Sequence, residues 1–76
     1  MSTMKLDVKT LYGRLDDKCA SLGKSWRSLG RELGMSQSVF TRMKCGRRPD
    51  ADALVTMVDW LDIPLAEVTR RDEEMP

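Results

Sequence analysis

The chain has 76 residues, of which 41% are hydrophobic and 33% are charged, and its formal net charge at pH 7 is +1. This length predicts one small domain over residues 1–76, and the composition is that of a globular protein. No run approaches the roughly 18 consecutive apolar residues of a membrane span, and the first residues lack the charged, apolar and small-residue series of a secretory signal. We therefore expect a cytoplasmic protein that does not contact a membrane.

The composition offers little support for catalysis or metal binding. The chain has no histidine, the commonest general base, and only two cysteines, Cys19 and Cys45. The cysteines lie far apart and form no CxxC pair, so we expect two reduced thiols rather than a disulfide or a zinc site. Asp16 and Asp17 are adjacent, and on a helix they diverge by about 100°. We expect no enzyme, no cofactor and no small-molecule ligand.

The first predicted helix follows Asp7, which is a suitable N-cap. Its apolar residues recur at steps of three and four, which indicates one buried face. These residues are Val8, Leu11, Tyr12, Leu15, Cys19 and Leu22. Leu6 can pack on the start of this helix as a hydrophobic staple. Gly13 in its interior costs about 1 kcal/mol relative to alanine, and Gly23 ends the helix.

The second predicted helix is short. Ser25 is its N-cap, and it extends through Leu33, where Gly34 stops it because glycine adopts positive φ without penalty. Leu29 and Leu33 form its apolar i, i+4 pair. We expect Gly30 and Gly34 to lie where the next helix approaches closely and where bulky side chains are excluded.

Ser36 is the N-cap of a third helix, which is predicted over residues 37–45 and is ended by Gly46. Its apolar positions Phe40 and Met43 are expected to face inward. Because so few residues separate the second and third helices, the two cannot run antiparallel and must cross steeply. This geometry is that of a helix-turn-helix, which we place at about residues 25–46.

Two further helices complete the expected fold. Asp50 is the N-cap of the fourth helix, which reaches about Leu61, and Pro64 is the first residue of a short fifth helix. Their apolar positions are Leu54, Met57, Val58, Leu61, Ile63, Leu65 and Val68. Residues 1–5 and 71–76 show no apolar pattern, so we expect them to fray. No segment alternates apolar and polar residues over several positions, and the predicted fold class is therefore all-α, with five compactly packed helices.

The charge is strongly polarised along the chain. Residues 1–24 carry a net charge of +2, residues 25–48 carry +5 and residues 49–76 carry −6. The positive segment coincides with the predicted helix-turn-helix, and a nucleic-acid backbone attracts such cations by counterion release. The acidic C-terminal third would limit indiscriminate binding. Taken singly, an arginine such as Arg27 or Arg31 is equally well explained as part of a solvated helix face.

The outer face of the third helix has side-chain types that suit the edges of bases. It has no carboxylate, whereas a face made for solubility more often pairs Glu with Lys. We predict that bases are read by Gln37, Ser38, Thr41 and Arg42. Glutamine can bond adenine bidentately, arginine can bond guanine in the same way, and serine and threonine reach either bases or phosphates. Val39 borders this face, where it either meets a thymine methyl group or fills the edge of the core.

The segment SWRSLGRELGMSQSVFTRMKCGRRPDADALVTMVDWLDIPLAEV, residues 25–68, resembles the phage-repressor and Cro-like helix-turn-helix family, also called the XRE family. The shared features are the apolar pattern, the turn glycine, the serine after the turn, a basic residue late in the recognition helix and a closing glycine. The resemblance implies a compact five-helix, lambda-repressor-like domain that binds operator DNA, usually as a symmetric dimer.

The resemblance also implies a set of contacts to the DNA backbone. We assign these to Ser36, Lys44, Arg47, Arg48, Trp26 and Arg27. Trp26 stands where the family often has a phosphate-binding glutamine, so its indole N–H either donates to phosphate or the ring packs. Gly30 replaces the usual alanine, Cys45 the usual asparagine before the closing glycine, and Asp62 the usual glycine after the fourth helix.

Trp60 lies next to Leu61 in the fourth helix, but it is outside the series of apolar positions at helical spacing. It either anchors a dimer contact or closes the edge of the core between the fourth and fifth helices. The predicted function is sequence-specific binding of double-stranded DNA by a prokaryotic or phage transcriptional repressor, located in the cytoplasm on the nucleoid. We expect a homodimer, at least on DNA, that reads a palindromic operator. Two alternatives stay open: an antitoxin that represses its own operon, and a protein-interaction module that has kept the fold.

Overall fold

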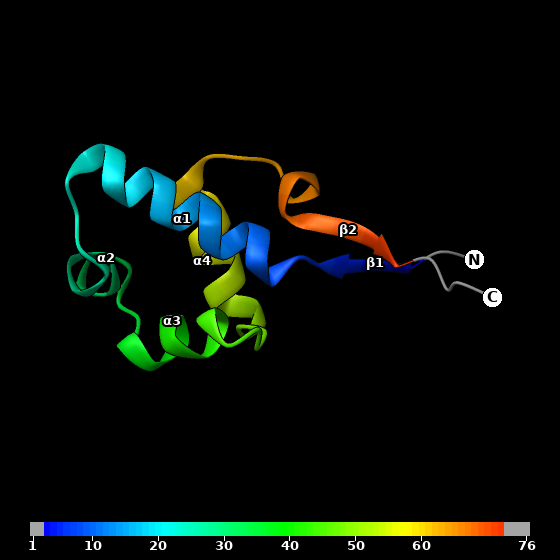
Figure 1. Ribbon diagram of the computed structural model, residues 1–76, viewed down its shortest axis with the longest axis horizontal. Helices are drawn as coiled ribbons and strands as arrows, with labels where there is room; N and C mark the ends of the chain where they lie inside the picture. The colour runs from blue at the N-terminus through cyan, green and yellow to red at the C-terminus, as the bar shows by residue number, and fades with distance from the viewer. Residues whose placement is uncertain (1–2, 73–76) are drawn as a thin grey trace.

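The computed structural model describes residues 3–72. Its elements in chain order are β1 (Thr3–Leu6), α1 (Val8–Leu22), α2 (Trp26–Leu33), α3 (Gln37–Lys44), α4 (Ala51–Leu61), the 3₁₀ turn η1 (Leu65–Val68) and β2 (Thr69–Asp72). The four α-helices of this part of the chain form the body of the molecule, and β1 and β2 project from it as a narrow arm (Figure 1). No helix within residues 3–72 is both long enough and apolar enough to cross a membrane.

The start of every α-helix is set by a polar N-cap. The side chains of Asp7, Ser25 and Asp50 each accept a hydrogen bond from the backbone N–H three residues later. Ser36 Oγ accepts from the backbone N–H of Ser38 at 3.2 Å. Each bond satisfies an N–H group that the first turn of a helix leaves unpaired. All four predicted N-caps are confirmed.

Three helices end in left-handed backbone, and the first of them is α1, which ends at Gly23 with φ of 68°. Gly34 ends α2 with φ of 67°, and Asp62 ends α4 with φ of 56°. A short polar side chain tolerates this conformation, so α4 ends without the glycine that is usual in the XRE family. A Cβ atom on Gly34 would meet nothing within 4 Å. The crowding predicted at Gly34 is therefore wrong, and its positive φ is what favours glycine there.

Gly30 is the point of close approach between α2 and α3. A Cβ atom there would overlap Gln37 Nε2, and it would lie 2.9 Å from the carbonyl oxygen of Met35 and 3.3 Å from Phe40 Cε2. Because the oxygen of Met35 belongs to the backbone, the turn itself would have to shift. The predicted exclusion of bulk is confirmed at this position, and even the alanine usual in the XRE family does not fit the turn as it stands.

The core lies where α1 packs against α3 and α4. Its buried residues are Val8, Leu11, Leu15, Cys19, Leu29, Phe40, Met43, Met57, Leu61 and Val68. Ten of the predicted apolar positions are therefore confirmed. Leu22 and Leu65, in contrast, are 53% and 49% exposed. Leu22 is the last residue of α1, followed by an exposed turn, and Leu65 is the first residue of η1.

The all-α prediction is wrong in one respect, because the chain also contains a small antiparallel sheet. β1 pairs with β2 so that Leu6 lies opposite Thr69. Next to this pair, the backbone N–H of Asp7 donates to the carbonyl oxygen of Val68 at 2.7 Å, which ties the arm to the body. β1 (TMKL) alternates polar and apolar residues over only four positions, and β2 (TRRD) contains no apolar residue at all. The sheet therefore could not be read from local spacing.

Two other expectations are corrected at the ends of the chain. The fraying predicted for residues 1–5 and 71–76 is wrong where these ranges overlap β1 and β2, while residues 1–2 and 73–76 lie outside the described residues. The predicted fifth helix is a 3₁₀ turn of four residues, and Pro64 precedes it instead of being its first residue. Because β2 begins directly after η1, no room is left for an α-helical turn to propagate.

Candidate nucleic-acid interface

The outer face of α3 is exposed to solvent. Its exposed residues are Gln37, Ser38, Thr41, Arg42 and Lys44. On the opposite side, Phe40 and Met43 are 3% and 2% exposed, which confirms their predicted inward orientation. α3 contains no Asp or Glu. All four predicted base-reading residues therefore lie on one accessible surface that carries no negative charge of its own.

Gln37 is held against α2 by a hydrogen bond. Its Nε2 donates to the backbone carbonyl of Trp26 at 2.9 Å, and the hydroxyl of Thr41 donates to the Gln37 carbonyl at 3.2 Å. An amide group has two N–H donors and one carbonyl acceptor. One N–H and the Oε1 atom of Gln37 thus remain for a ligand, and these are the two groups that a bidentate pair with adenine needs.

The N-terminal end of α3 carries two linked hydroxyl groups. The Oγ atoms of Ser36 and Ser38 lie 2.9 Å apart, and both residues are exposed. The N-terminus of a helix has a partial positive charge and incompletely paired N–H groups. A phosphate that approached this end of α3 would meet hydroxyl donors and a favourable dipole together.

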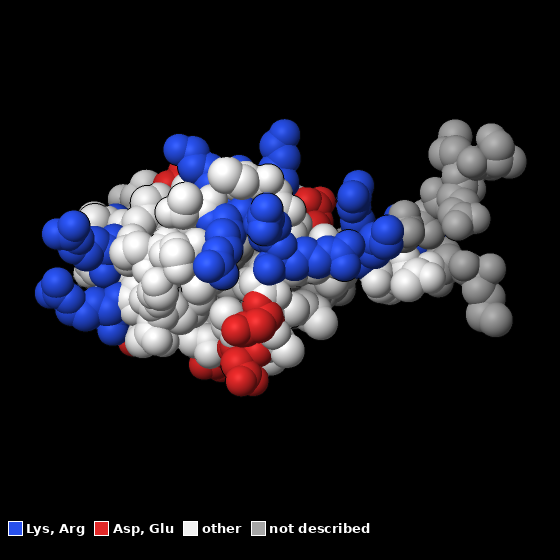
Figure 2. Space-filling view, turned by 90° about the horizontal axis from the view of Figure 1, so that it is seen from below, with Lys and Arg blue, Asp and Glu red and all other residues white. Residues whose placement is uncertain are grey.

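The cations of α2, α3 and the following loop have no acidic partners. They are Arg27, Arg31, Arg42, Lys44, Arg47 and Arg48, all exposed, and none forms an ion pair or a side-chain hydrogen bond within residues 3–72. Figure 2 views the molecule from the side of α3, and Lys and Arg side chains gather along this face while the largest group of Asp and Glu lies at one edge. Unpaired cations of this kind can neutralise phosphates, which releases counterions.

Trp26 packs within the helical body. Its ring stacks on Tyr12 with centroids 4.6 Å apart, and it lies 5.1 Å from the ring of Phe40. The residue is half-buried and links α1, α2 and α3. Of the two roles open to Trp26, the structure shows the packing role. Its indole N–H has no hydrogen-bond partner within residues 3–72, and its bond to phosphate stays a prediction.

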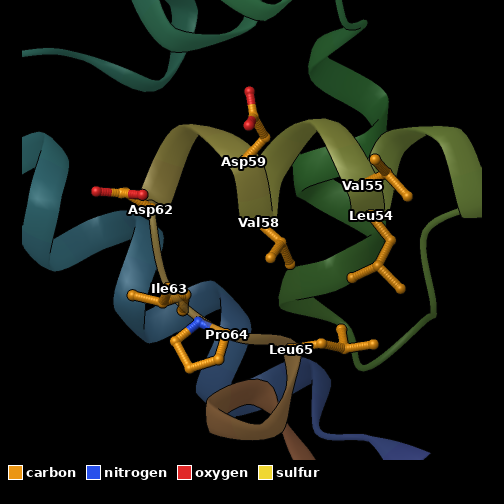
Figure 3. A pocket seen from close by; sticks show the side chains of 8 residues that line it. All are labelled: Leu54, Val55, Val58, Asp59, Asp62, Ile63, Pro64 and Leu65. Atoms are coloured by element: carbon orange, nitrogen blue, oxygen red, sulfur yellow. The ribbon is translucent and has the colours of Figure 1, made fainter.

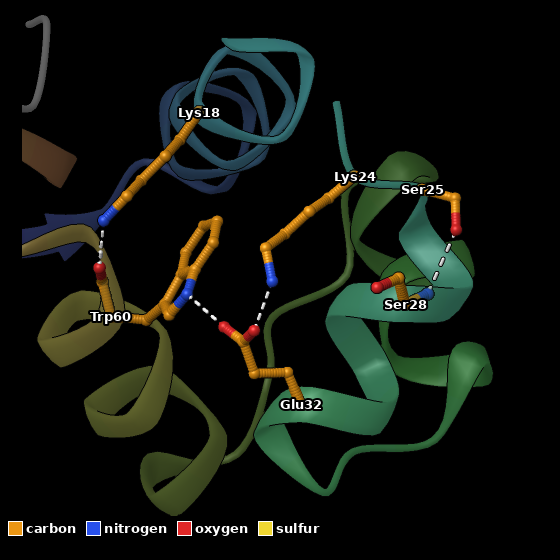
Figure 4. Close-up of polar contacts among 6 residues, drawn as sticks. All are labelled: Lys18, Lys24, Ser25, Ser28, Glu32 and Trp60. Carbon is orange, nitrogen blue, oxygen red and sulfur yellow. Dashed lines mark hydrogen bonds and ion pairs between the residues drawn. The ribbon is translucent and has the colours of Figure 1, made fainter. Parts of the chain in front are cut away.

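Trp60 is engaged by residues of α1 and α2. Its Nε1 donates to Glu32 Oε2 at 2.6 Å, and the ammonium of Lys24 binds the other carboxylate oxygen of Glu32 (Figure 4). The ammonium of Lys18 donates to the Trp60 carbonyl and lies 4.5 Å from the centroid of its ring. The residue therefore ties α4 to α1 and α2. Any dimer contact at Trp60 would have to use the edge of the ring that these contacts leave exposed.

This network also compensates the negative charge of Glu32, the only acidic residue in the basic segment 25–48. The hydrogen bond from the Lys24 ammonium, followed by that from the Trp60 indole, lowers the pKa of Glu32 below its ordinary value. The carboxylate thus stays ionised but is compensated by a neighbouring cation. It does not oppose the cations of α2 and α3 as a bare charge would.

Both cysteines are free thiols, with Cys19 buried and Cys45 exposed at the C-cap of α3. Burial, with a smaller contribution from Asp16, raises the pKa of the Cys19 thiol. Such a thiol is a poor nucleophile, and Cys19 acts here as a small apolar residue of the core. Within residues 3–72, no three His, Cys, Asp or Glu side chains gather as metal ligands would.

A second surface feature is an apolar groove of about 590 Å³ between α4 and η1. It is lined by Leu54, Val55, Val58, Asp59, Asp62, Ile63, Pro64 and Leu65. Figure 3 shows the apolar side chains around the gap and Asp59 turned away from it. Val55 is 67% exposed. This groove was not predicted from the sequence because Val55 lies outside the apolar positions at helical spacing. Residues 49–69 contain no Lys or Arg, so this side is unsuited to DNA.

No protein-family model, curated protein or solved structure matches this chain. The resemblance to the XRE family therefore stays a prediction from the sequence.

Proposed function

We propose that this protein binds double-stranded DNA sequence-specifically through α3 and acts as a transcriptional repressor of the XRE type. One observation carries the proposal: the exposed face of α3 combines hydrogen-bonding side chains with a complete lack of carboxylates. Six exposed cations without ion-pair partners surround it within the described part of the chain. This is the arrangement that base reading flanked by phosphate contacts requires.

The proposed mechanism places α3 in the major groove, which is wide enough to admit an α-helix. Arg42 would bond O6 and N7 of a guanine, and Gln37 would bond an adenine. The hydrogen bond from Gln37 to Trp26 supports this role, because a side chain already ordered in the unbound protein loses less entropy on binding. Ser38 and Thr41 complete the set of groups that can reach base edges.

Contacts to the backbone would fix the register of α3 in the groove. We assign them to Ser36, Lys44, Arg47 and Arg48, with Arg27 at the start of α2. These residues lie at both ends of α3, so they can reach phosphates on either side of the bases that are read. The acidic segment after Pro49 limits non-specific attraction to DNA.

We further propose that a second copy of the chain covers the groove between α4 and η1. Val55 and Leu65 are exposed there, and large apolar side chains grouped on a surface mark an interaction site. A symmetric dimer would read two half-sites about 34–36 Å apart, which accounts for a palindromic operator. The groove lies in the acidic segment after Pro49, so the two copies would repel each other, and salt should strengthen the dimer while it weakens DNA binding.

The experiment that tests the function is selection of bound duplexes from a random pool, followed by titration at several salt concentrations. A palindromic consensus with salt-dependent affinity would support both the specificity and the symmetry. The absence of any salt-sensitive complex with duplex DNA in dilute buffer would refute the proposal. That result would favour the protein-interaction alternative, for which the groove between α4 and η1 is the place to look.

A further inference from the structure

A hollow of about 420 Å³ lies between α1 and the C-terminal end of α3. It is lined by Lys9, Tyr12, Met43, Lys44, Cys45 and Gly46. α1 packs directly on α3, so the fold brings Lys9 and Lys44 to one concavity although 34 residues separate them in the chain. Neither the charge pattern nor the resemblance singled out Lys9.

The hollow has an apolar floor and a positive rim. Met43 is 2% exposed, and Tyr12 is half-buried with its ring stacked on Trp26. Lys9 and Lys44 are exposed and form no ion pair within residues 3–72. No carboxylate is among the lining residues. The Tyr12 hydroxyl also has no hydrogen-bond partner in the described part of the chain, so it can donate one.

We propose that this hollow seats one sugar–phosphate unit of the DNA strand that passes the C-terminal end of α3. The deoxyribose would lie on Met43 and the ring of Tyr12, while Lys9 and Lys44 would hold the phosphate between them. The Tyr12 hydroxyl would donate to a phosphate oxygen. This inference rests on the proposed function and adds α1 to the elements that contact DNA.

The position of Lys44 favours DNA over other anionic ligands. Lys44 follows Thr41 by three residues on α3, so the two lie on neighbouring positions of one helix face. A strand whose bases are read by Thr41 and Arg42 therefore has its backbone next to this hollow. The two lysines would also attract an acidic peptide, but a peptide has no base edges through which Thr41 and Arg42 could fix its register beside the hollow.

The test compares the salt dependence of binding for the parent, Lys9→Ala and Arg14→Ala, on the duplex selected from the random pool. Arg14 is an exposed cation of the same helix, about 140° around from Lys9, and it pairs with Glu67 at 3.8 Å. Both variants lose one positive charge. Lys9→Ala is expected to reduce the slope of log affinity against log salt by about 0.9, the value for one phosphate contact. Arg14→Ala is expected to keep the parent slope.

Two further measurements place the contact. A duplex series with single neutral methylphosphonate groups should show one position per half-site that weakens the parent but leaves Lys9→Ala unaffected. Tyr12→Phe keeps the stacked ring, and it should weaken binding by about tenfold without changing the salt slope, because the lost hydrogen bond involves a neutral donor.

The possible failures can be told apart. If the parent binds no duplex, both the proposed function and the proposed role of the hollow are refuted. If the parent binds but Lys9→Ala keeps the parent slope, the assignment of the hollow as a sugar–phosphate site is wrong, while the proposed role of α3 stands. An equal loss of slope in Arg14→Ala would show a general charge effect and would also overturn the assignment. Because Lys9 is exposed, equal thermal midpoints of Lys9→Ala and the parent should exclude a folding defect as the cause.

Discussion

Replacing Gly30 with alanine tests the close approach of α2 and α3 directly. In a helix interior alanine is more favourable than glycine by about 1 kcal/mol. At Gly30 the added Cβ atom would overlap Gln37 Nε2 and lie 2.9 Å from the carbonyl oxygen of Met35. Overpacking that forces a backbone shift typically costs about 1–3 kcal/mol. The steric cost should therefore cancel or exceed the gain in helix propensity.

Gly13→Ala is the matched control for this substitution. Gly13 lies in the interior of α1, its φ is not positive, and an added Cβ atom would meet nothing within 4 Å. Because both changes carry the same gain in helix propensity, their difference isolates the steric cost at Gly30. We expect Gly13→Ala to be more stable than Gly30→Ala by about 1–3 kcal/mol.

Urea or thermal unfolding followed by circular dichroism measures this difference. In a domain of this size, 1 kcal/mol corresponds to a shift of about 4–8 °C in Tm. Equal stabilisation by the two substitutions would refute the close approach at Gly30. The same variant bears on function, since displacing the amide of Gln37 breaks its hydrogen bond to Trp26 and should weaken specific DNA binding more than non-specific binding.

Three other substitutions test separate parts of the molecule. Arg42→Ala should cost about 1–3 kcal/mol of specific DNA binding and relax the preference at one base pair, measured with single-base operator variants; unchanged specificity would contradict the placement of α3. Val55→Asp should convert a dimer to a single chain in light scattering and leave the helical content unchanged by circular dichroism, since Val55 is 67% exposed in the single chain. Glu32 has a lowered pKa, so its contribution to stability is present above about pH 4.5 and is lost as the pH falls through its folded-state value. Glu32→Gln should therefore lose less stability than the parent on acidification. A pH profile of Tm equal to that of the parent would contradict a stabilising contribution from the ionised Glu32 carboxylate.

The parts of the fold that the sequence predicted well are those set by local signals. Asp7, Ser25, Ser36 and Asp50 are polar residues directly before apolar series at helical spacing, and each caps the helix expected of it. Capping depends on a hydrogen bond between residues two or three positions apart, so the information lies within a few residues of the chain. The exposed face of α3 followed from the same periodicity.

The features that escaped prediction depend on residues far apart in the chain. β1 and β2 join segments at opposite ends of the sequence, and β2 has no apolar residue that could reveal an alternating pattern. The bond between Trp60 and Glu32 spans 28 residues, and it requires α2 and α4 to be placed before it can be foreseen. The hollow with Lys9 likewise exists only once α1 is packed on α3.

The network around Glu32 also changes how the charge of the basic segment should be counted. By sequence, residues 25–48 hold six cations and one carboxylate. In the structure that carboxylate is bound by Lys24, which lies outside the segment, so all six cations remain unpaired within the described residues. With Lys9 added, seven cations are available, and the salt slope of DNA binding should be no steeper than about −6 per chain at 0.9 for each phosphate. A steeper measured slope would require contacts from the arm, where Arg70 and Arg71 are exposed. A much shallower slope would mean that most of these cations stay in solvent, which would leave α3 without the backbone contacts that fix its register.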